Sequence, residues 1–446
     1  MASILPIAIG LALITGAGGY LPQAWDWLKH NAVLRDLLVE SWPVTYEVGG
    51  SEVGLVYYVG HYLPAAAIGK ALGWEAANAA MLAWTTIGIA LAISWFVTHV
   101  GPVAKPAFIA MFFMVFSGLD AVGRALLGPL LSMPDVVLPS GQLDWWAGVA
   151  LYPANVTSVM WGPQHALAGW VATGLVLYAA RSGYTRWVVA IVPMVAIFSP
   201  FVVVGLLPIV GAALVRKARS GSWREQLLSG PALLAGFACL PVLAFFIAAT
   251  ADLPFDVGGG IEMGFIVSNP IFDFGMPRVV ASYLLFVVLE FGVLGALIFR
   301  GGSLRSEPLM RRLLLASILM LTALPLLRYG QWSDLAMRAS GPGLFVLAVC
   351  GVRALFCSPR RSPVRLLLIA VFVLGAVTPM TEIARAVTDH HVRGSVVREH
   401  FDSGDVDATS GIVELSRTHY RDTPRFLVQY VGSVDTFFYE HVSAVD

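Results

Sequence analysis

The chain has 446 residues, of which 57% are hydrophobic and only 13% are charged, and its formal net charge is zero. Soluble globular proteins carry about 25% charged residues, so this composition excludes an ordinary soluble domain and indicates a chain that lies largely in a membrane. The zero net charge and the lack of a compact Lys/Arg run argue against a nucleic-acid partner. We therefore expect an all-α polytopic membrane protein.

Apolar segments recur along the whole chain. A bilayer core about 30 Å thick needs about 20 apolar residues per crossing, and fewer where helices are short or buried in protein. This rule predicts about eleven crossings, in a range of about 10 to 13. The candidate spans are residues 4–21, 76–98, 106–119, 163–180, 187–200, 201–216, 230–250, 279–299, 311–328, 341–357 and 363–382. Within 187–216 we expect a helical hairpin that breaks at Ser199-Pro200.

Short basic loops predict the orientation, because loops rich in Lys and Arg remain in the cytoplasm. Four such loops contain Arg181 and Arg186; Arg216, Lys217, Arg219 and Arg224; Arg300, Arg305, Arg311 and Arg312; and Arg360, Arg361 and Arg365. With these loops inside, the N-terminus is cytoplasmic and the C-terminus extracytoplasmic. Segment 53–73 is apolar, but a crossing there would bring loop 120–162 inside. We therefore expect 53–73 to form a helix at the outer surface.

This topology divides the chain into a membrane domain, residues 1–382, and a small extracytoplasmic appendage, residues 383–446. The outer loops of the membrane domain are residues 22–75, 120–162, 250–278 and 329–340. The appendage contains an aromatic stretch from Phe426 to Phe438 that favours β-structure. We expect an integral membrane protein of the bacterial inner (plasma) membrane.

The first outer loop contains a candidate general base. At about 100° per residue, Asp26, Lys29, Asp36 and Glu40 fall within one quarter of a helical wheel. The pattern predicts an amphipathic helix at the membrane surface with its acids held over water. Asp26 directly follows the first span, where a carboxylate can reach a lipid-linked head group and accept a proton. The alternative is an interfacial anchor whose acids only face solvent.

The second outer loop begins with Asp120 and Arg124 at the outer end of a short span. The aromatic residues and the polar residues that follow them are Trp145, Trp146, Tyr152, Trp161, Gln164 and His165. Trp and Tyr are typical of membrane interfaces, so both an aromatic belt and a platform for a sugar or prenyl chain remain open. His165 is a candidate base or metal ligand, or a hydrogen-bonded structural residue.

Three further charged residues flank the loop 329–340. Arg328, Asp334 and Arg338 lie near apolar spans, and arginine binds phosphate oxygens through two parallel hydrogen bonds. The alternative is an internal Asp334–Arg338 pair at i, i+4 spacing. Glu290 lies in the middle of a span, where an ionisable residue is usually functional or paired. We expect no second charge deep in another span.

Four features follow one another in the first part of the chain. An acid, Asp26, follows the first span, and an outer-surface helix comes next, GLVYYVGHYLPAAAIGKALG from Gly54 to Gly73. A span from Trp74 to Ala92 follows, and a second outer acid, Asp120, comes after an inside turn and a short span. In this order the chain resembles the GT-C superfamily of integral membrane glycosyltransferases, by pattern over residues 1 to about 200 and by hydropathy beyond.

The resemblance implies an inverting transfer from a polyprenyl-phosphate sugar donor to a glycan or lipid acceptor among membrane lipids. It implies Asp26 as the base, Asp120 as its support, and Arg328 and Arg338 as phosphate ligands. The remaining candidates for substrate binding are His30, Asp36, Tyr57, Tyr58, His61, Arg124, Trp161, Gln164, His165 and Asp334. No cofactor is required; if a metal is bound, Mg²⁺ or Mn²⁺ at Asp26, Asp120 and His165 is expected. The alternative is a lipid-linked oligosaccharide flippase or another transporter, for which Glu290 would be essential.

Overall fold

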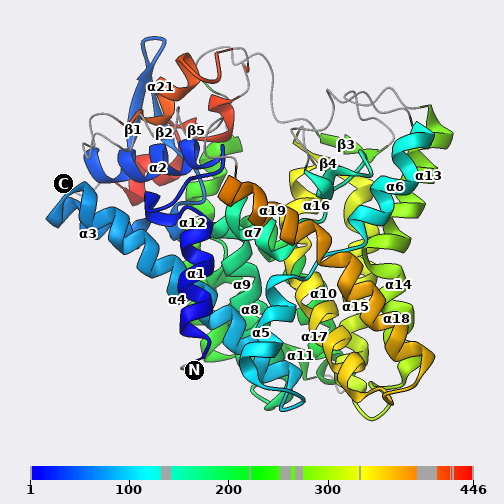
Figure 1. Ribbon diagram of the computed structural model, residues 1–446. Helices are drawn as coiled ribbons and strands as arrows, with labels where there is room; N and C mark the ends of the chain where they lie inside the picture. Colours follow the sequence, from blue (N-terminus) through cyan, green and yellow to red (C-terminus); the bar gives the residue numbers. More distant parts are fainter. Residues whose placement is uncertain are drawn as a thin grey trace.

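Helices make up most of the protein (Figure 1). The computed structural model describes residues 3–131, 142–219, 222–250, 253, 263–266, 275–330, 333–388, 409–421, 423 and 426–443. Its helices are α1 Leu5–Ile14, α2 Trp27–Val39, α3 Leu63–Leu72, α4 Trp74–Val100, α5 Pro106–Met114, α6 Asp120–Leu131, α7 Asn155–Trp161, α8 Pro163–Arg181, α9 Thr185–Met194, α10 Pro200–Arg219, α11 Trp223–Leu227, α12 Gly230–Ile247, α13 Met276–Val287, α14 Val293–Gly301, α15 Pro308–Ala323, α16 Asp334–Ala339, α17 Gly341–Cys357, α18 Pro363–Gly375, α19 Val377–Thr388 and α21 Ile412–Arg417. The strands are β1 Thr45–Val48, β2 Ser51–Leu55, β3 Met263–Phe265, β4 Leu327–Tyr329 and β5 Val431–Ser433.

Several of these helices are long and apolar enough to cross a membrane, as expected of an integral membrane protein. Among the described residues five helices meet this criterion: Trp74–Val100, Gly230–Thr250, Met276–Gly301, Pro308–Leu326 and Pro363–Val387. The third of them contains a π-helical turn, Val288–Gly292, between α13 and α14. The predicted break at Ser199-Pro200 is confirmed, because α9 ends at Met194 and α10 begins at Pro200. Proline suits this first position, where its missing N–H leaves no hydrogen bond unmade.

The predicted basic loops gather at one end of the helical body, which we name the basic end. Arg353 of α17 is ion-paired with Glu307, which precedes α15, and donates to the carbonyl of His99 in α4 (3.2 Å). Arg181 at the end of α8 lies 3.7 Å from the same Glu307 carboxylate. Helix α11 lies at this lower end in Figure 1. The ends of α4, α8 and α17 and the turn before α15 are therefore on the same side.

The opposite end, the loop end, holds two small sheets. Strands β1, β2 and β5 form an antiparallel sheet in which Val53 of β2 pairs with Ser433 of β5, and β3 pairs with β4. The β-leaning stretch of the tail is therefore confirmed at Val431–Ser433. The predicted boundary at residue 382 falls inside α19, and the rest of 383–408, after that helix, lies outside the described residues. The prediction of one helix over 53–73 is wrong, because β2 and a 3₁₀ turn precede the ten-residue α3.

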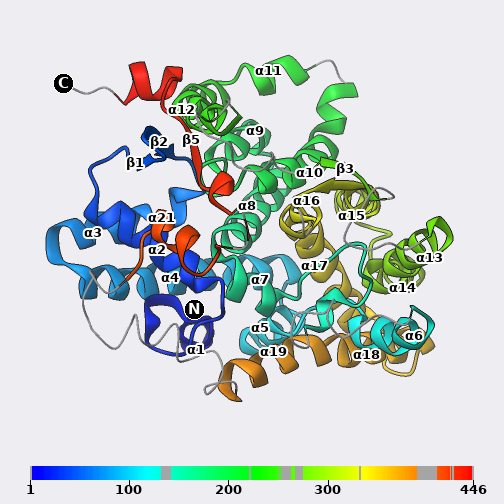
Figure 2. The ribbon, with the colours of Figure 1, turned by 90° about the horizontal axis from the view of Figure 1, so that it is seen from above.

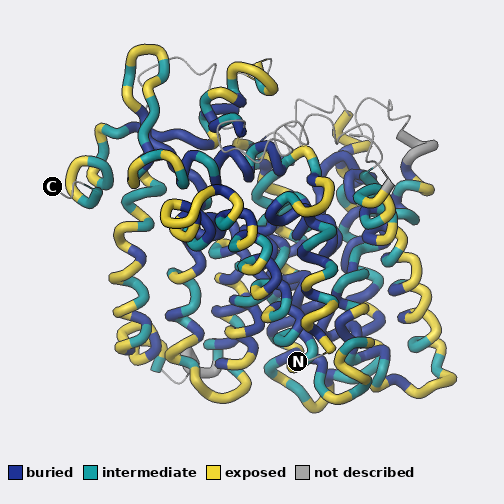
Figure 3. Tube along the Cα trace, turned by 60° about the vertical axis from the view of Figure 1, so that its left-hand side comes forward, coloured by how far each residue is buried: buried dark blue, intermediate teal, exposed yellow. Residues whose placement is uncertain are grey.

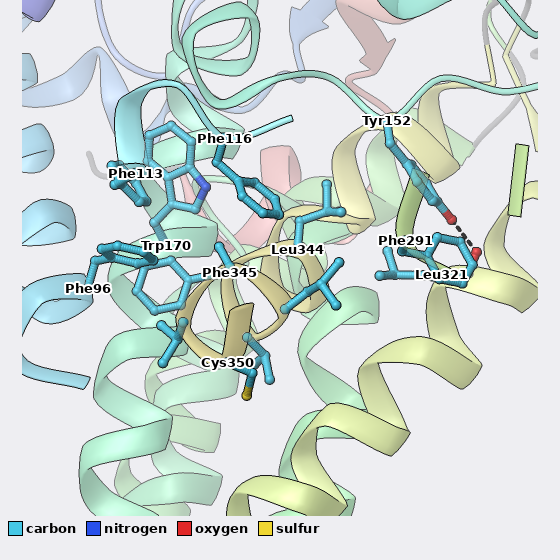
Figure 4. Packing of buried hydrophobic residues seen from close by; sticks show 14 of the residues in the cluster. Phe96, Phe113, Phe116, Tyr152, Trp170, Phe291, Leu321, Leu344, Phe345 and Cys350 are labelled. Atoms are coloured by element: carbon cyan, nitrogen blue, oxygen red, sulfur yellow. Dashed lines mark hydrogen bonds between the residues drawn. The ribbon is translucent and has the colours of Figure 1, made fainter. Parts of the chain in front are cut away.

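Buried side chains fill the centre of the body (Figure 3). Around α17, the rings of Phe96, Phe113, Trp170 and Phe345 meet largely edge to face, with centroids 4.9 Å apart for Phe113 and Trp170 (Figure 4). Such aromatic pairs add about 0.5–1.5 kcal/mol each beyond the area that they bury. A second cluster of buried residues lies at the loop end, between α2, α3 and the tail. This rigid base holds the loop-end side chains in place.

Candidate functional site

Six separate parts of the chain, whose backbones come close together at the loop end in Figure 2, contribute side chains to one cluster. We name them the Arg338 cluster: His30, Tyr57, Tyr58, His61, Tyr62, Trp161, Gln164, His165, Ser199, Phe201, Asp334, Arg338 and Tyr430. They come from α2, the β2–α3 segment, the α7–α8 junction, the α9–α10 break, α16 and the tail.

Arg338 is the cation of the cluster. Its guanidinium is ion-paired with Asp334 one helical turn earlier (2.8 Å) and donates to the hydroxyl of Tyr58 (3.4 Å). It also lies over the rings of Tyr58 and Phe201, at 5.6 and 5.4 Å from their centroids. The predicted Asp334–Arg338 pair is therefore present, yet the side chain of Arg338 is still 22% exposed. An arginine held in this way by aromatic faces can still donate hydrogen bonds to phosphate oxygens.

His30 joins two segments of the cluster. Its Nδ1 lies 2.5 Å from the hydroxyl of Tyr62, and its Nε2 lies 3.1 Å from the carbonyl oxygen of Trp161. Burial lowers the pKa of His30 to about 4 and that of His61 to about 3. Both imidazoles are therefore neutral near pH 7.

The α7–α8 junction packs directly on the segment that follows β2. Gln164 donates to the hydroxyl of Tyr57 (3.4 Å), and the ring of His165 meets that of Tyr58 edge to face at 4.8 Å. His165 Nδ1 lies 2.7 Å from Ser199 Oγ. His165 thus makes the structural hydrogen bond that was one of its predicted roles, through Nδ1. Its Nε2 is buried and has no hydrogen-bond partner among the described residues.

Asp26 lies at the edge of the cluster. It precedes α2, its side chain is 28% exposed, and its carboxylate lies 2.6 Å from Lys29 Nζ. Burial disfavours the charge of Lys29, but the Asp26 carboxylate more than offsets this and the pKa of Lys29 is raised. The charges of Asp26 and Arg338 both act on His30, Tyr57, Tyr62 and Tyr430. The carboxylate and the guanidinium thus lie within electrostatic range of the same four side chains.

A second group of buried polar side chains lies between α6, the π-helical turn, the 142–154 segment and α19. Asp120 accepts hydrogen bonds from Ser117 (2.5 Å) and Thr378 (2.8 Å). Glu290 accepts from Trp146 Nε1 (2.7 Å) and lies within electrostatic range of Asp120. Of two further buried acids, Asp144 lies within electrostatic range of Asp120 and Glu290, and Glu382 lies within range of Asp144 and is ion-paired with Arg385 (2.7 Å). We name these four acids the acid cluster.

The acid cluster corrects two predictions. Glu290 is not alone, because Asp120 contacts it from another helix. Asp120 does not support Asp26 either, since α6 and α2 lie on opposite sides of the loop end in Figures 1 and 2. Its neighbour Arg124 is on α6 as well. Helical spans look independent in a sequence, and only their packing reveals which acids meet.

Asp36 is also placed differently from the prediction. It was expected over water, yet it is 1% exposed and accepts hydrogen bonds from Tyr46 (2.8 Å), from the backbone N–H of Ile412 (2.9 Å) and from Arg35 (3.0 Å). Nine of the thirteen residues of α2 are buried, because α3 packs against this helix and α21 of the tail covers it near Asp36. Asp36 therefore fixes the tail to the first outer loop.

Arg328 does not form an arginine pair with Arg338. It lies in β4, where neighbouring side chains point to opposite faces of the strand. The next residue, Tyr329, meets Phe201 at 5.3 Å on the side of Arg338. Arg328 therefore points away from the cluster.

The predicted metal ligands do not come together. Asp26 is ion-paired with Lys29, Asp120 lies in the acid cluster, and His165 lies in the Arg338 cluster. Among the described residues, no group of three or more His, Cys, Asp or Glu side chains is arranged to hold a metal ion. These residues do not fit the metal site that the resemblance implied.

Several residues of the two clusters were not predicted. Tyr62, Ser199, Phe201 and Tyr430 of the Arg338 cluster, and Asp144 and Glu382 of the acid cluster, have no motif of their own, and tertiary packing brings them to their cluster. A sequence signal existed for Tyr62 alone, since it follows Tyr57, Tyr58 and His61 in the same segment.

No protein-family profile, no curated protein and no solved structure matches this chain.

Proposed function

We propose that this protein is a membrane glycosyltransferase that moves a sugar from a polyprenyl-phosphate carrier to an acceptor hydroxyl. One observation carries the proposal: Asp26 and Arg338 lie within electrostatic range of the same four tyrosine and histidine side chains. A transfer of this kind needs a carboxylate to accept a proton and a cation to stabilise the leaving phosphate. The cluster offers both on one face.

The proposed topology has about eleven crossings in a GT-C-like arrangement. The basic end would lie in the cytoplasm of a bacterial cell, by the positive-inside rule, and the loop end would lie outside the inner membrane. The joint position of Arg181, Glu307 and Arg353 supports this, because three basic loops meet at one end. The Arg338 cluster then lies at the outer face, where a carrier phosphate would be found.

In the proposed step the acceptor oxygen attacks the anomeric carbon from the side opposite the carrier phosphate. The bond between this carbon and the phosphate oxygen breaks, and the configuration inverts. The acceptor hydroxyl loses its proton to the carboxylate of Asp26, which is ion-paired with Lys29 (2.6 Å). The polyprenyl phosphate leaves with the bonding electrons, and Arg338 stabilises its negative charge.

The substitution Asp26→Asn tests the base. Loss of a general base typically costs about 10²- to 10⁴-fold in rate, so we expect transfer from a labelled polyprenyl-phosphate sugar to fall at least about 100-fold. Folding should be retained, because the side chain is partly exposed. Glu40→Gln, at the exposed end of the same helix, is the matched control and should leave the rate unchanged. Full activity of Asp26→Asn would reject Asp26 as the base.

The acid cluster favours a second candidate function, a proton-coupled transporter or flippase. Buried carboxyl groups in contact cannot all be ionised, and acids inside a helical membrane domain often relay protons. In that case Glu290→Gln should abolish substrate flux in proteoliposomes. A glycosyltransferase carrying Glu290→Gln should retain transfer chemistry in detergent, provided that it folds.

A further inference from the structure

Four buried polar atoms in the Arg338 cluster have no hydrogen-bond partner within the described protein. They are His61 Nε2, Trp161 Nε1, Gln164 Oε1 and His165 Nε2. Buried polar atoms without a partner are rare, and each one calls for an explanation. Leaving such a group unpaired costs about 1–3 kcal/mol, so four of them on two short segments indicate that something else pairs with them.

The two segments are held against each other. Residues 57–62 and 161–165 are joined by His30, which contacts the hydroxyl of Tyr62 and the carbonyl of Trp161. The hydrogen bond from Gln164 to Tyr57 and the contact between Tyr58 and His165 join them again. His61 also lies within electrostatic range of His165 across the same junction. The four atoms thus belong to one region.

The chemistry of these atoms restricts their partner. The indole N–H of Trp161 only donates and the amide oxygen of Gln164 only accepts, while a neutral imidazole nitrogen does one or the other according to tautomer. A hydroxyl group donates and accepts, so a ring with several hydroxyls satisfies such a mixed set. A carboxylate only accepts and would be repelled by Gln164 Oε1. The guanidinium of Arg338 is paired with Asp334, and the proposed function assigns its remaining N–H donors to the carrier phosphate.

We propose that His61, Trp161, Gln164 and His165 form a subsite for an uncharged, hydroxyl-bearing sugar ring. The inference rests on the proposed function for the carrier that delivers the sugar, and it deepens that function by naming the sugar class. Arg338 holds the phosphate, and the subsite selects a neutral hexose over a uronic acid.

The test measures binding to the full chain in lipid nanodiscs. Its three ligands are polyprenyl phosphate, the same carrier with a neutral hexose, and the same carrier with a hexuronic acid. We expect the hexose donor to bind roughly tenfold more tightly than the bare carrier, and the uronate donor to gain nothing. Gln164→Glu should remove the gain from the hexose and leave binding of the bare carrier unchanged. Gln226→Glu, a buried glutamine bonded to Thr185 at the basic end, is the matched control.

The outcomes separate the two proposals. If none of the three ligands binds, the proposed function fails. If the bare carrier binds but the hexose adds nothing, or the uronate binds more tightly, the subsite proposal alone fails and the four atoms pair with water.

A second measurement uses the wild-type protein and therefore tests the subsite even if Gln164→Glu does not fold. In the wild-type protein labelled with ¹⁵N-histidine, the hexose donor should shift the Nε2 signals of His61 and His165 relative to bare carrier. The Nε2 signal of His99, which is bonded to the carbonyl of Gly174, should stay in place. Unchanged signals for His61 and His165 would overturn the subsite.

Discussion

The neutral state of His30 has a consequence for stability. The pKa of its imidazole is about 4 in the folded protein, because burial disfavours the charged form, and 6.5 is its ordinary value. At a pH between about 4 and 6.5, His30 carries a proton in the unfolded chain but not in the folded protein. The free energy of unfolding therefore falls as the pH falls from about 6.5 to about 4, by at most about 3 kcal/mol. His61 contributes in the same direction.

The substitution His30→Gln should flatten this pH dependence. The measurement is the midpoint of thermal unfolding in nanodiscs at several values between pH 7 and pH 5. The wild type should lose stability on acidification more steeply than His30→Gln, whereas His441→Gln, an exposed histidine in the tail, should follow the wild type. Parallel curves for all three proteins would show that His30 is already protonated or exposed.

At the scale of single elements, Asp36 fixes the tail to the first outer loop. Its carboxylate accepts hydrogen bonds from α2, β1 and the start of α21 at once. Removing one partner of a buried charged network typically costs about 3–5 kcal/mol. Asp36→Asn should therefore lower the unfolding midpoint and expose residues 409–443 to protease.

Glu52→Gln in the neighbouring strand β2 is the control for this prediction, because Glu52 is exposed. It should leave both the unfolding midpoint and the cleavage pattern unchanged. If Asp36→Asn is cleaved no faster than Glu52→Gln, the tail is held by its apolar contacts and not by Asp36.

Some elements could be predicted from the sequence and others could not. Long apolar runs such as Trp74–Val100 and the Ser199-Pro200 break follow from local physical chemistry, and so do the basic loops. The pairing of β5 with β2 could not be predicted, because three residues of the tail carry no signal for a partner about 380 positions away. The prediction of one helix over the apolar segment 53–73 was wrong because a buried strand and a buried helix have similar hydropathy.

The same distinction holds for the candidate site. The sequence favoured Tyr57, Tyr58, His165 and Arg338 separately by residue type, and the fold brings them together. It could not predict that Asp120 lies with Glu290 instead of Asp26, because the packing of α6 decides this. The helical pattern of charged residues predicts that Asp36 faces solvent, and only the tertiary structure shows that the tail covers it.

At the scale of the whole molecule, the sidedness of the two ends can be tested by cysteine labelling. In a background that lacks the exposed Cys357, Ser51→Cys at the loop end and Arg360→Cys at the basic end are the two reporters. A reagent that does not cross membranes should modify Ser51→Cys in intact cells, and Arg360→Cys only after permeabilisation. The reverse pattern would place the Arg338 cluster in the cytoplasm.

The central claim is that the Arg338 cluster binds a polyprenyl-phosphate sugar. The most direct measurement is a cryo-electron-microscopy map of the full chain with a non-transferable phosphonate analogue of the donor. We predict phosphonate density at the guanidinium of Arg338, with the sugar between residues 57–62 and 161–165 and within reach of Asp26. Density for the head group at the acid cluster of Asp120 and Glu290, or at the basic end, would contradict the account.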